Sequence, residues 1–140
     1  MIKKVAALLF CVLFGLTLTV SAQKKTHKVI FVVTSPDQND WSTATTLADH
    51  FIAGIKPESA DVEVLSYGPA IPILAKSSPV TKEIADLEKL GVHFVACRNA
   101  MRAFKIAEAD LLPGVTSVPS GVVELVQRQE AGYSYVKVGR

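Results

Sequence analysis

His27-Lys-Val-Ile-Phe-Val-Val-Thr34 is the stretch of sequence that decides the fold. Its centre, residues 29–33, is a continuous run of apolar and mostly β-branched side chains. A run without polar alternation is typical of a strand that is buried on both faces, as the strands of parallel sheets are. The stretch therefore favours an α/β domain built on a parallel sheet.

The rest of the chain alternates between helical and extended patterns. Residues 41–55 place apolar side chains at steps of three and four, which predicts an amphipathic helix. Further helices are expected over residues 79–90, with Pro79 at the first position, over about 100–106, and over 122–131. In the last of these, Val122, Leu125 and Val126 are expected to point inward.

The remaining extended segments complete a sheet. Strands are expected over residues 61–67, 92–96, 115–118 and 133–138, and the first of these alternates poorly enough to suggest a position near an edge. Strands and helices in this order predict one three-layer α/β/α domain over residues 23–140, with a mostly parallel five-stranded sheet. The apolar segment 70–75, which contains Pro72, fits a loop, a short helix or a surface against another subunit.

A functional site is expected where the strands end. In open α/β sheets, ligands bind in the crevice outside the carboxyl ends of the strands. Residues that follow the predicted strand ends and could line such a crevice are Ser35, Tyr67, Cys97, Arg98, Asn99, Ser120 and Gly121.

Cys97 is the residue in this set that carries chemistry. It sits in Gly91-Val-His-Phe-Val-Ala-Cys-Arg-Asn-Ala-Met-Arg102, between a predicted strand and a helix that Asn99 is expected to cap. Free N–H groups at the helix start, together with Arg98 and Arg102, favour the thiolate, which is the nucleophilic form. The alternative is a buried, inert cysteine that packs as a small apolar residue.

Residues 1–22 have the pattern of a secretory signal peptide. Lys3 and Lys4 precede an apolar run over residues 5–20, and Ser21-Ala22 supplies small residues for cleavage. The run is shorter than the about 20 residues that a spanning helix needs, so cleavage is favoured over an uncleaved anchor. We expect a periplasmic protein with no stable membrane insertion after cleavage, and with Cys97 as its single cysteine.

The charge balance argues against nucleic acid as a partner. The full chain has 15 basic and 13 acidic residues, and removal of the leader with its two lysines leaves 13 of each. A protein that binds the phosphate backbone needs a basic patch, and none is visible in the sequence.

Other site types lack their sequence signatures. There is no Gly-rich phosphate loop, no nucleophile-elbow serine, and no histidine spacing that suits a metal ion. His93 and Cys97 lie four residues apart on a predicted strand, about 13 Å, too far to share one ion. Ser120-Gly121 could bind an anion at a helix start or act as a simple cap. We expect neither a metal nor a cofactor.

Several segments together resemble the DsrE/DsrF-like family of sulfur-relay proteins. They are residues 91–102, Ala109-Asp-Leu-Leu-Pro-Gly-Val115, residues 118–129 and Gly132-Tyr-Ser-Tyr135, within a similarity that runs from about His27 to the C-terminus. The resemblance implies a small α/β fold in homo- or hetero-oligomers, often trimers or hexamers. It also implies that Cys97 matches the cysteine that accepts sulfane sulfur as a persulfide in relay members, which are cytoplasmic.

Three hypotheses about function follow. The first is a periplasmic sulfur carrier, sulfurtransferase-like if it turns over, that exchanges sulfur with a small donor or acceptor or with a thiol protein. It needs no cofactor, because the persulfide on Cys97 is the cargo. The second is a non-enzymatic oligomeric scaffold with a strand-end pocket or with residues 71–75 as a docking segment. The third is a thiol redox sensor.

Overall fold

The computed structural model describes residues 25–139, and the expected signal peptide lies outside them. Five parallel strands form one sheet in the order β4-β3-β2-β1-β5. The strands are β1 (Thr26–Val33), β2 (Ser59–Ser66), β3 (Val92–Cys97), β4 (Thr116–Val118) and β5 (Ser134–Val138). The helices are α2 (Gln38–Ile55), α3 (Thr81–Lys89), α4 (Arg98–Ala103) and α5 (Gly121–Glu130), with 3₁₀ helices η1 (Gly68–Leu74) and η2 (Glu108–Asp110).

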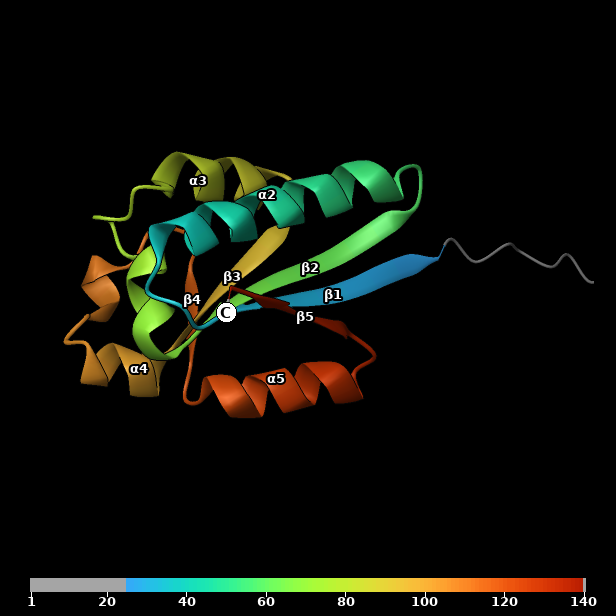
Figure 1. Ribbon diagram of the computed structural model, residues 1–140. Helices are drawn as coiled ribbons and strands as arrows, with labels where there is room; N and C mark the ends of the chain where they lie inside the picture. The colour runs from blue at the N-terminus through green and yellow to red at the C-terminus, as the bar shows by residue number, and fades with distance from the viewer. Residues whose placement is uncertain (1–24, 140) are drawn as a thin grey trace, which may run out of the picture.

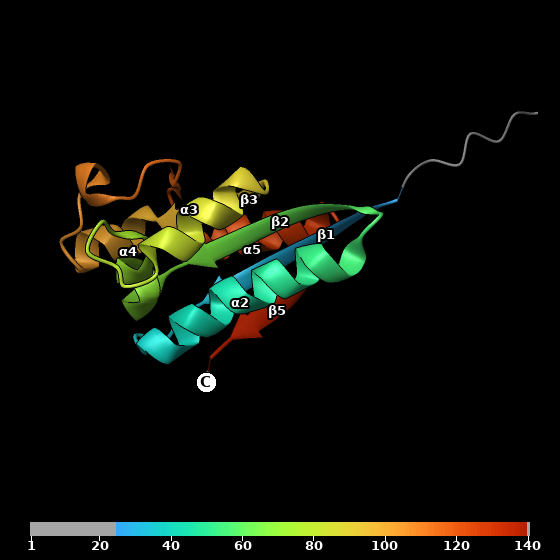
Figure 2. The same cartoon turned by 90° about the horizontal axis from the view of Figure 1, so that it is seen from above.

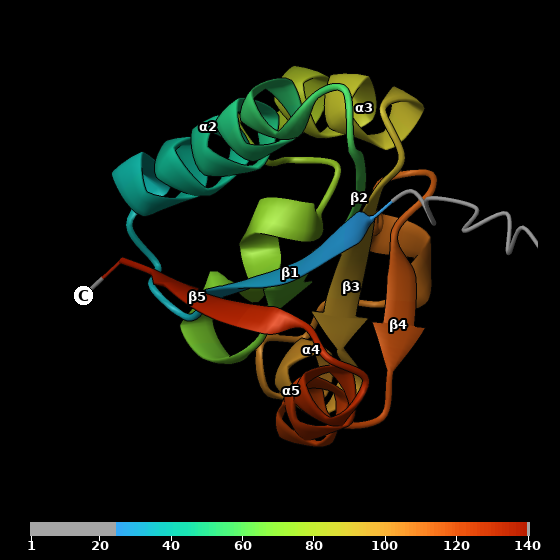
Figure 3. The same ribbon diagram turned by 90° about the vertical axis from the view of Figure 1, so that its right-hand side faces the viewer.

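Helices cover both faces of the sheet, so the three-layer α/β/α architecture is confirmed. Helices α2 and α3 lie on one face and α5 lies on the other (Figures 1 and 3). The view from above shows the strands side by side beneath α2 and α3, with β5 at one edge (Figure 2). Within residues 25–139, no helix is both long and apolar enough to cross a membrane.

Strand β1 is buried on both faces, as its sequence predicts. Val29, Phe31 and Val33 join the large core under α2 and α3. Ile30 and Val32 join a smaller core under α5, together with Leu65, Val95 and Tyr133. Within the described residues, α5 is the one long helix on its face of the sheet, whereas α2 and α3 share the other face. The two cores are therefore unequal in size.

The expectation that the second strand lies near an edge is wrong. Strand β2 pairs with both β1 and β3, close to the middle of the sheet. Its alternation is poor because Glu63 occupies a buried position, where its carboxylate pairs with Arg128 at 2.7 Å. A charge is tolerated there because it is paired.

The apolar segment after β2 is part of the core. It forms η1, and the side chains of Ile71, Ile73 and Leu74 are completely buried. Within residues 71–75 only Pro72 is partly exposed, so this segment offers little apolar surface for the docking role of the scaffold hypothesis.

Three helix boundaries or faces differ from expectation. Helix α3 begins at Thr81 with Val80 as its N-cap, so Pro79 precedes the helix instead of opening it. Leu90 and Leu47 are exposed, and so are Val122 and Val126, which were expected to face inward. On α5, Gly121 is the buried residue and Leu125 packs partly against the small core.

A tryptophan fixes the loop between β1 and α2. The buried Trp41 indole donates a hydrogen bond from Nε1 to the backbone carbonyl of Ser35 at 2.8 Å. The Ser35 hydroxyl accepts from the backbone N–H of Asp37 at 3.1 Å, and Asp37 caps α2 by accepting from the N–H of Asn39 at 2.9 Å. This chain of bonds connects the end of β1 to the first turn of α2.

Replacing Trp41 should therefore weaken this connection. We expect Trp41→Phe to lower the free energy of unfolding by about 1–2 kcal/mol, because the Ser35 carbonyl loses its buried donor. Urea unfolding followed by far-UV circular dichroism measures this, since Trp41 is the chain's single tryptophan and its fluorescence is lost. The exposed Ser42→Ala should change stability by less than about 0.5 kcal/mol, and an equally small effect of Trp41→Phe would contradict the assignment.

Candidate functional site

Cys97 lies where β3 passes directly into α4. It is the last residue of β3, pairs in register with Val118 of β4, and is also the N-cap of α4. The expectation that Asn99 caps this helix is wrong, because no loop residue separates strand from helix and Asn99 already lies inside α4. Cys97 is 5% exposed, and it forms no disulfide with any residue of the range 25–139.

Gly121, Tyr67 and Cys97 meet at the strand ends, as the sequence predicts for these positions. A methyl group placed on Gly121 would lie 3.0 Å from Cβ of Tyr67 and 3.2 Å from Cβ of Cys97. Both side chains therefore pack against the backbone at the first residue of α5. A larger residue at position 121 would push this helix away from the ends of β2 and β3.

Tyr67 forms one wall of this site. Its backbone is extended at the end of β2, and its ring packs partly against both cores. Burial raises the pKa of Tyr67, and the proximity of Tyr135 and Cys97 raises this pKa further. The Tyr67 hydroxyl therefore remains protonated at neutral pH and is available as a donor.

Tyr135 is a neighbour of this site that sequence reasoning did not find. It lies on β5 in register with Ile30 of β1. The sequence predicts the strand but not its place in the sheet, so nothing in it indicates that Tyr135 approaches Tyr67.

The start of α5 supplies free backbone donors beside Cys97. Ser120 is the N-cap, but its side chain makes no capping hydrogen bond. The N–H groups in the first turn of a helix have no partner within that helix. Since Gly121 opens a helix of ten residues and abuts Cys97, the first turn of this helix lies next to the cysteine.

The two arginines near Cys97 are engaged by other partners. Arg98 donates to the Ser117 hydroxyl at 3.1 Å and lies 3.8 Å from the carboxylate of Glu108, which accepts from the same hydroxyl. Arg102 donates to the side-chain oxygen of Asn99. These bonds fasten α4 to β4 and η2, and an electrostatic role of the arginines at Cys97 stays a prediction.

Ser35 stands apart from the other predicted site residues. It follows β1, which is separated from β3 by β2 in the sheet. Its Cβ lies 3.1 Å from the position of a methyl group placed on Gly139, beside β5. The structure therefore brings Ser35 to the same edge of the sheet but not into contact with Cys97.

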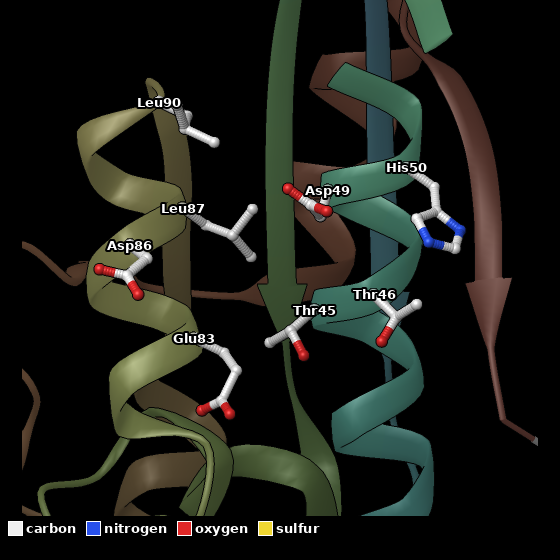
Figure 4. A pocket seen from close by; sticks show the side chains of 8 residues that line it. All are labelled: Thr45, Thr46, Asp49, His50, Glu83, Asp86, Leu87 and Leu90. Carbon is white, nitrogen blue, oxygen red and sulfur yellow. The ribbon is translucent and has the colours of Figure 1, made fainter. Parts of the chain in front are cut away.

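A shallow groove lies on the opposite face of the sheet. Helices α2 and α3 enclose a volume of about 350 Å³ there, with the side chains of Asp49 and Glu83 turned toward it and His50 turned away from α3 (Figure 4). Within residues 25–139, no three His, Cys, Asp or Glu side chains are arranged to hold a metal ion. The groove is thus an exposed acidic surface, remote from Cys97.

A side chain at position 121 should disturb the site. We expect Gly121→Ala to lower the free energy of unfolding by about 1–3 kcal/mol, because the new methyl group overlaps Tyr67 and Cys97. We also expect faster alkylation of Cys97 by iodoacetamide, measured by mass spectrometry, because α5 must move outward. Gly54→Ala is the matched control, since a methyl group there meets nothing within 4 Å. An unchanged alkylation rate in Gly121→Ala would show that α5 does not limit access to the thiol.

Comparison with solved structures gives matches to the whole fold. A protein of unknown function, MTH1491 from Methanobacterium thermoautotrophicum, is 30% identical with a TM-score of 0.75, covering 79% of this chain and 98% of that chain. The ychN protein from E. coli is 13% identical with a TM-score of 0.64 over 79% of this chain and 98% of its own. BT1422 from Bacteroides thetaiotaomicron, also of unknown function, is 17% identical with a TM-score of 0.61. The match covers 85% of this chain and 98% of that chain.

A family model gives the more specific match. No curated protein is significantly similar to the chain. The model of the DsrE/DsrF-like family matches residues 27–138, which include all five strands and Cys97. The chain therefore belongs to the DsrE/DsrF-like family.

Proposed function

We propose that this protein carries sulfane sulfur as a persulfide on Cys97. The observation that carries the proposal is the position of Cys97, nearly buried at the end of β3 and packed against Gly121, the first residue of α5. Membership of the DsrE/DsrF-like family supports a role related to sulfur relay. The persulfide is the cargo in this scheme, so the chemistry uses the side chain alone.

Loading and unloading are two thiol exchange steps. The Cys97 thiolate attacks the outer sulfur of a persulfide or polysulfide, the S–S bond of the donor breaks, and the donor leaves as a thiolate. The product is Cys97–S–SH. An acceptor thiolate or sulfite then attacks the terminal sulfur, and Cys97 leaves as a thiolate. No external oxidant or reductant is required.

The surroundings of Cys97 suit an anionic sulfur. Free N–H groups at the start of α5 can donate to a thiolate or to a terminal persulfide sulfur. The protonated hydroxyl of Tyr67, a neighbour of Cys97, is a further candidate donor. Because Cys97 is only 5% exposed, a small donor is favoured over a bulky one unless α5 moves.

The location of this chemistry is also part of the proposal. The basic start, the apolar run and the small residues within positions 1–22 support cleavage and export, so the carrier would work in the periplasm. Its donor and acceptor would then be small sulfur compounds or thiol proteins of that compartment. Repeated transfer between the two would make it sulfurtransferase-like.

Mass spectrometry tests the persulfide directly. We expect the protein purified from cells to gain the mass of one or more sulfur atoms after exposure to polysulfide, and to lose it with cyanide or a reductant. Peptide mapping should place the sulfur on Cys97, and Cys97→Ser should gain none. The intact mass also shows whether the chain begins at Gln23, as cleavage predicts.

Two results would overturn the carrier proposal. The absence of any adduct, with Cys97 also unreactive toward iodoacetamide, would identify an inert core cysteine. A disulfide-linked dimer that appears on a non-reducing gel after peroxide, with no sulfur uptake, would favour the redox sensor.

We further propose that the protein is a homo-oligomer, a trimer or a hexamer, as its resemblance to the family implies. Helix α5 supports this, because Val122, Val123 and Val126 are all exposed on its outer side. Exposed Tyr135 on β5 adds to the apolar surface on the same side of the sheet. A second copy of the chain is the occupant that would bury these side chains.

Sedimentation velocity tests the assembly. The wild-type protein should sediment as a trimer or hexamer. The double variant Val123→Lys/Val126→Lys should shift toward the monomer, because assembly would bury the two new lysine charges without partners. Leu47→Lys, a change at an exposed apolar position on α2 and thus on the other face of the sheet, is the control and should leave the assembly intact. A monomeric wild-type protein would contradict the proposal.

A further inference from the structure

Glu63 is a buried carboxylate at the centre of the sheet. It lies on β2, in register with Ile30 of β1 and His93 of β3, and its side chain is 1% exposed. Its Oε2 lies 2.7 Å from Nε of Arg128, while the buried Oε1 has no hydrogen-bond partner among the residues that the structure describes. The carboxylate is thus only half satisfied.

Arg128 connects this carboxylate to α5. The same Nε lies 2.7 Å from a carboxylate oxygen of Glu124, one turn earlier on the helix. The guanidinium also lies 5.3 Å from the centre of the Tyr133 ring, whose hydroxyl donates to Asp61 at 2.6 Å. Two carboxylates therefore share one cation beneath the helix.

Helix α5 contacts the sheet at both of its ends. At its start, the buried Gly121 packs on Tyr67 and Cys97. Near its end, Arg128 reaches Glu63, and Lys28 of β1 donates to the backbone carbonyl of Ala131 at 3.2 Å. Between them, Leu125 packs partly against the small core while the valines of the outer side remain exposed. The same short helix therefore connects the Glu63 ion pair to the contact with Cys97.

We infer that Glu63 is a positioning residue that controls, through Arg128 and α5, how far Cys97 is accessible, and that its ionisation makes this access increase with pH. The inference depends on the proposed function only for its biological purpose, since access to the thiol is measurable without any sulfur donor.

The sign follows from the environment of the carboxylate. Burial raises the pKa of Glu63 from 4.5 to about 7, Glu124 and Asp61 raise it too, and Arg128 opposes the rise. With α5 detached, the carboxylate would be hydrated and its pKa would fall back toward 4.5. The docked helix therefore binds the proton more tightly, so docking is favoured at low pH and weakened as pH rises through about 7.

Every charged neighbour of the carboxylate enters this balance. Helix α5 contributes Arg128 and Glu124, and β2 contributes Asp61. Strand β3 places His93 in register beside Glu63, and Lys28 of β1 lies over the Tyr133 ring at 5.6 Å. His93 is exposed, whereas Glu63 is buried.

Hydrogen exchange of the α5 amides tests the attachment. We expect the protection factors of residues 124–130, whose amides are hydrogen-bonded within the helix, to fall roughly 10- to 30-fold between about pH 5.5 and about pH 8 in the wild-type protein. Glu63→Gln keeps the shape but cannot ionise, so its protection factors should not depend on pH. Arg128→Gln removes the opposing cation and should steepen the dependence. Opposite effects of these two substitutions separate a role in ionisation from a merely structural one.

Alkylation of Cys97 by iodoacetamide, in the same variants, tests the connection to the site. The ratio of the wild-type rate to the Glu63→Gln rate cancels the titration of the thiol itself, and we expect this ratio to rise with pH. Glu130→Gln, an exposed charge change on the same helix, is the control and should behave like the wild type. His93→Gln should likewise retain the wild-type dependence.

Two outcomes would overturn the inference. If Glu63→Gln keeps the pH dependence of the wild-type protection factors, Glu63 does not control α5. If α5 responds but the alkylation ratio stays constant, the helix does not control Cys97. A failure of sulfur uptake affects neither measurement, so the proposed function and this inference fall separately.

Discussion

The contact of Gly121 with Tyr67 and Cys97 is the constraint on which the site depends. Parallel strands bring the ends of β2 and β3 to one edge of the sheet, but they do not by themselves cover that edge. The cover arises because α5 begins with a residue that has no side chain, so its backbone can lie against both strand ends. The first turn of α5 then lies beside a cysteine that is shielded from bulk water.

Much of this arrangement could be predicted from the sequence, because its signals are local. The unbroken apolar run of residues 29–33 indicates a strand buried on both faces, and the alternation of helices and strands indicates a parallel sheet. Because the strands of a parallel sheet all end at the same edge, these two signals also predict that Tyr67, Cys97 and Gly121 lie together there. Ser35 was grouped with them by the same rule, but the order of strands places it farther along the edge.

What could not be predicted depends on partners that are distant in the sequence. Strand β2 was expected near an edge because of Glu63, and only the position of Arg128 on α5 explains a carboxylate in the middle of the sheet. Val122 and Val126 were expected to point inward on the assumption that the apolar side of α5 faces the sheet. Instead, Gly121, Leu125 and Arg128 face it, since a close approach at one end and an ion pair at the other determine the rotation of the helix.

These features give α5 an unusual position in the molecule. A helix held by a broad apolar face would be indifferent to one carboxylate, because many contacts would share the energy of attachment. Helix α5 has only a small core beneath it, so the cost of keeping a half-satisfied buried carboxylate charged is large compared with the apolar contacts that hold the helix. In the proposed oligomer, a neighbouring subunit would press on the exposed valines and oppose detachment. Assembly and protonation of Glu63 would then act in the same direction, because both would close the helix over Cys97. Dissociation of the subunits or loss of the Glu63 proton would open the path to the thiol.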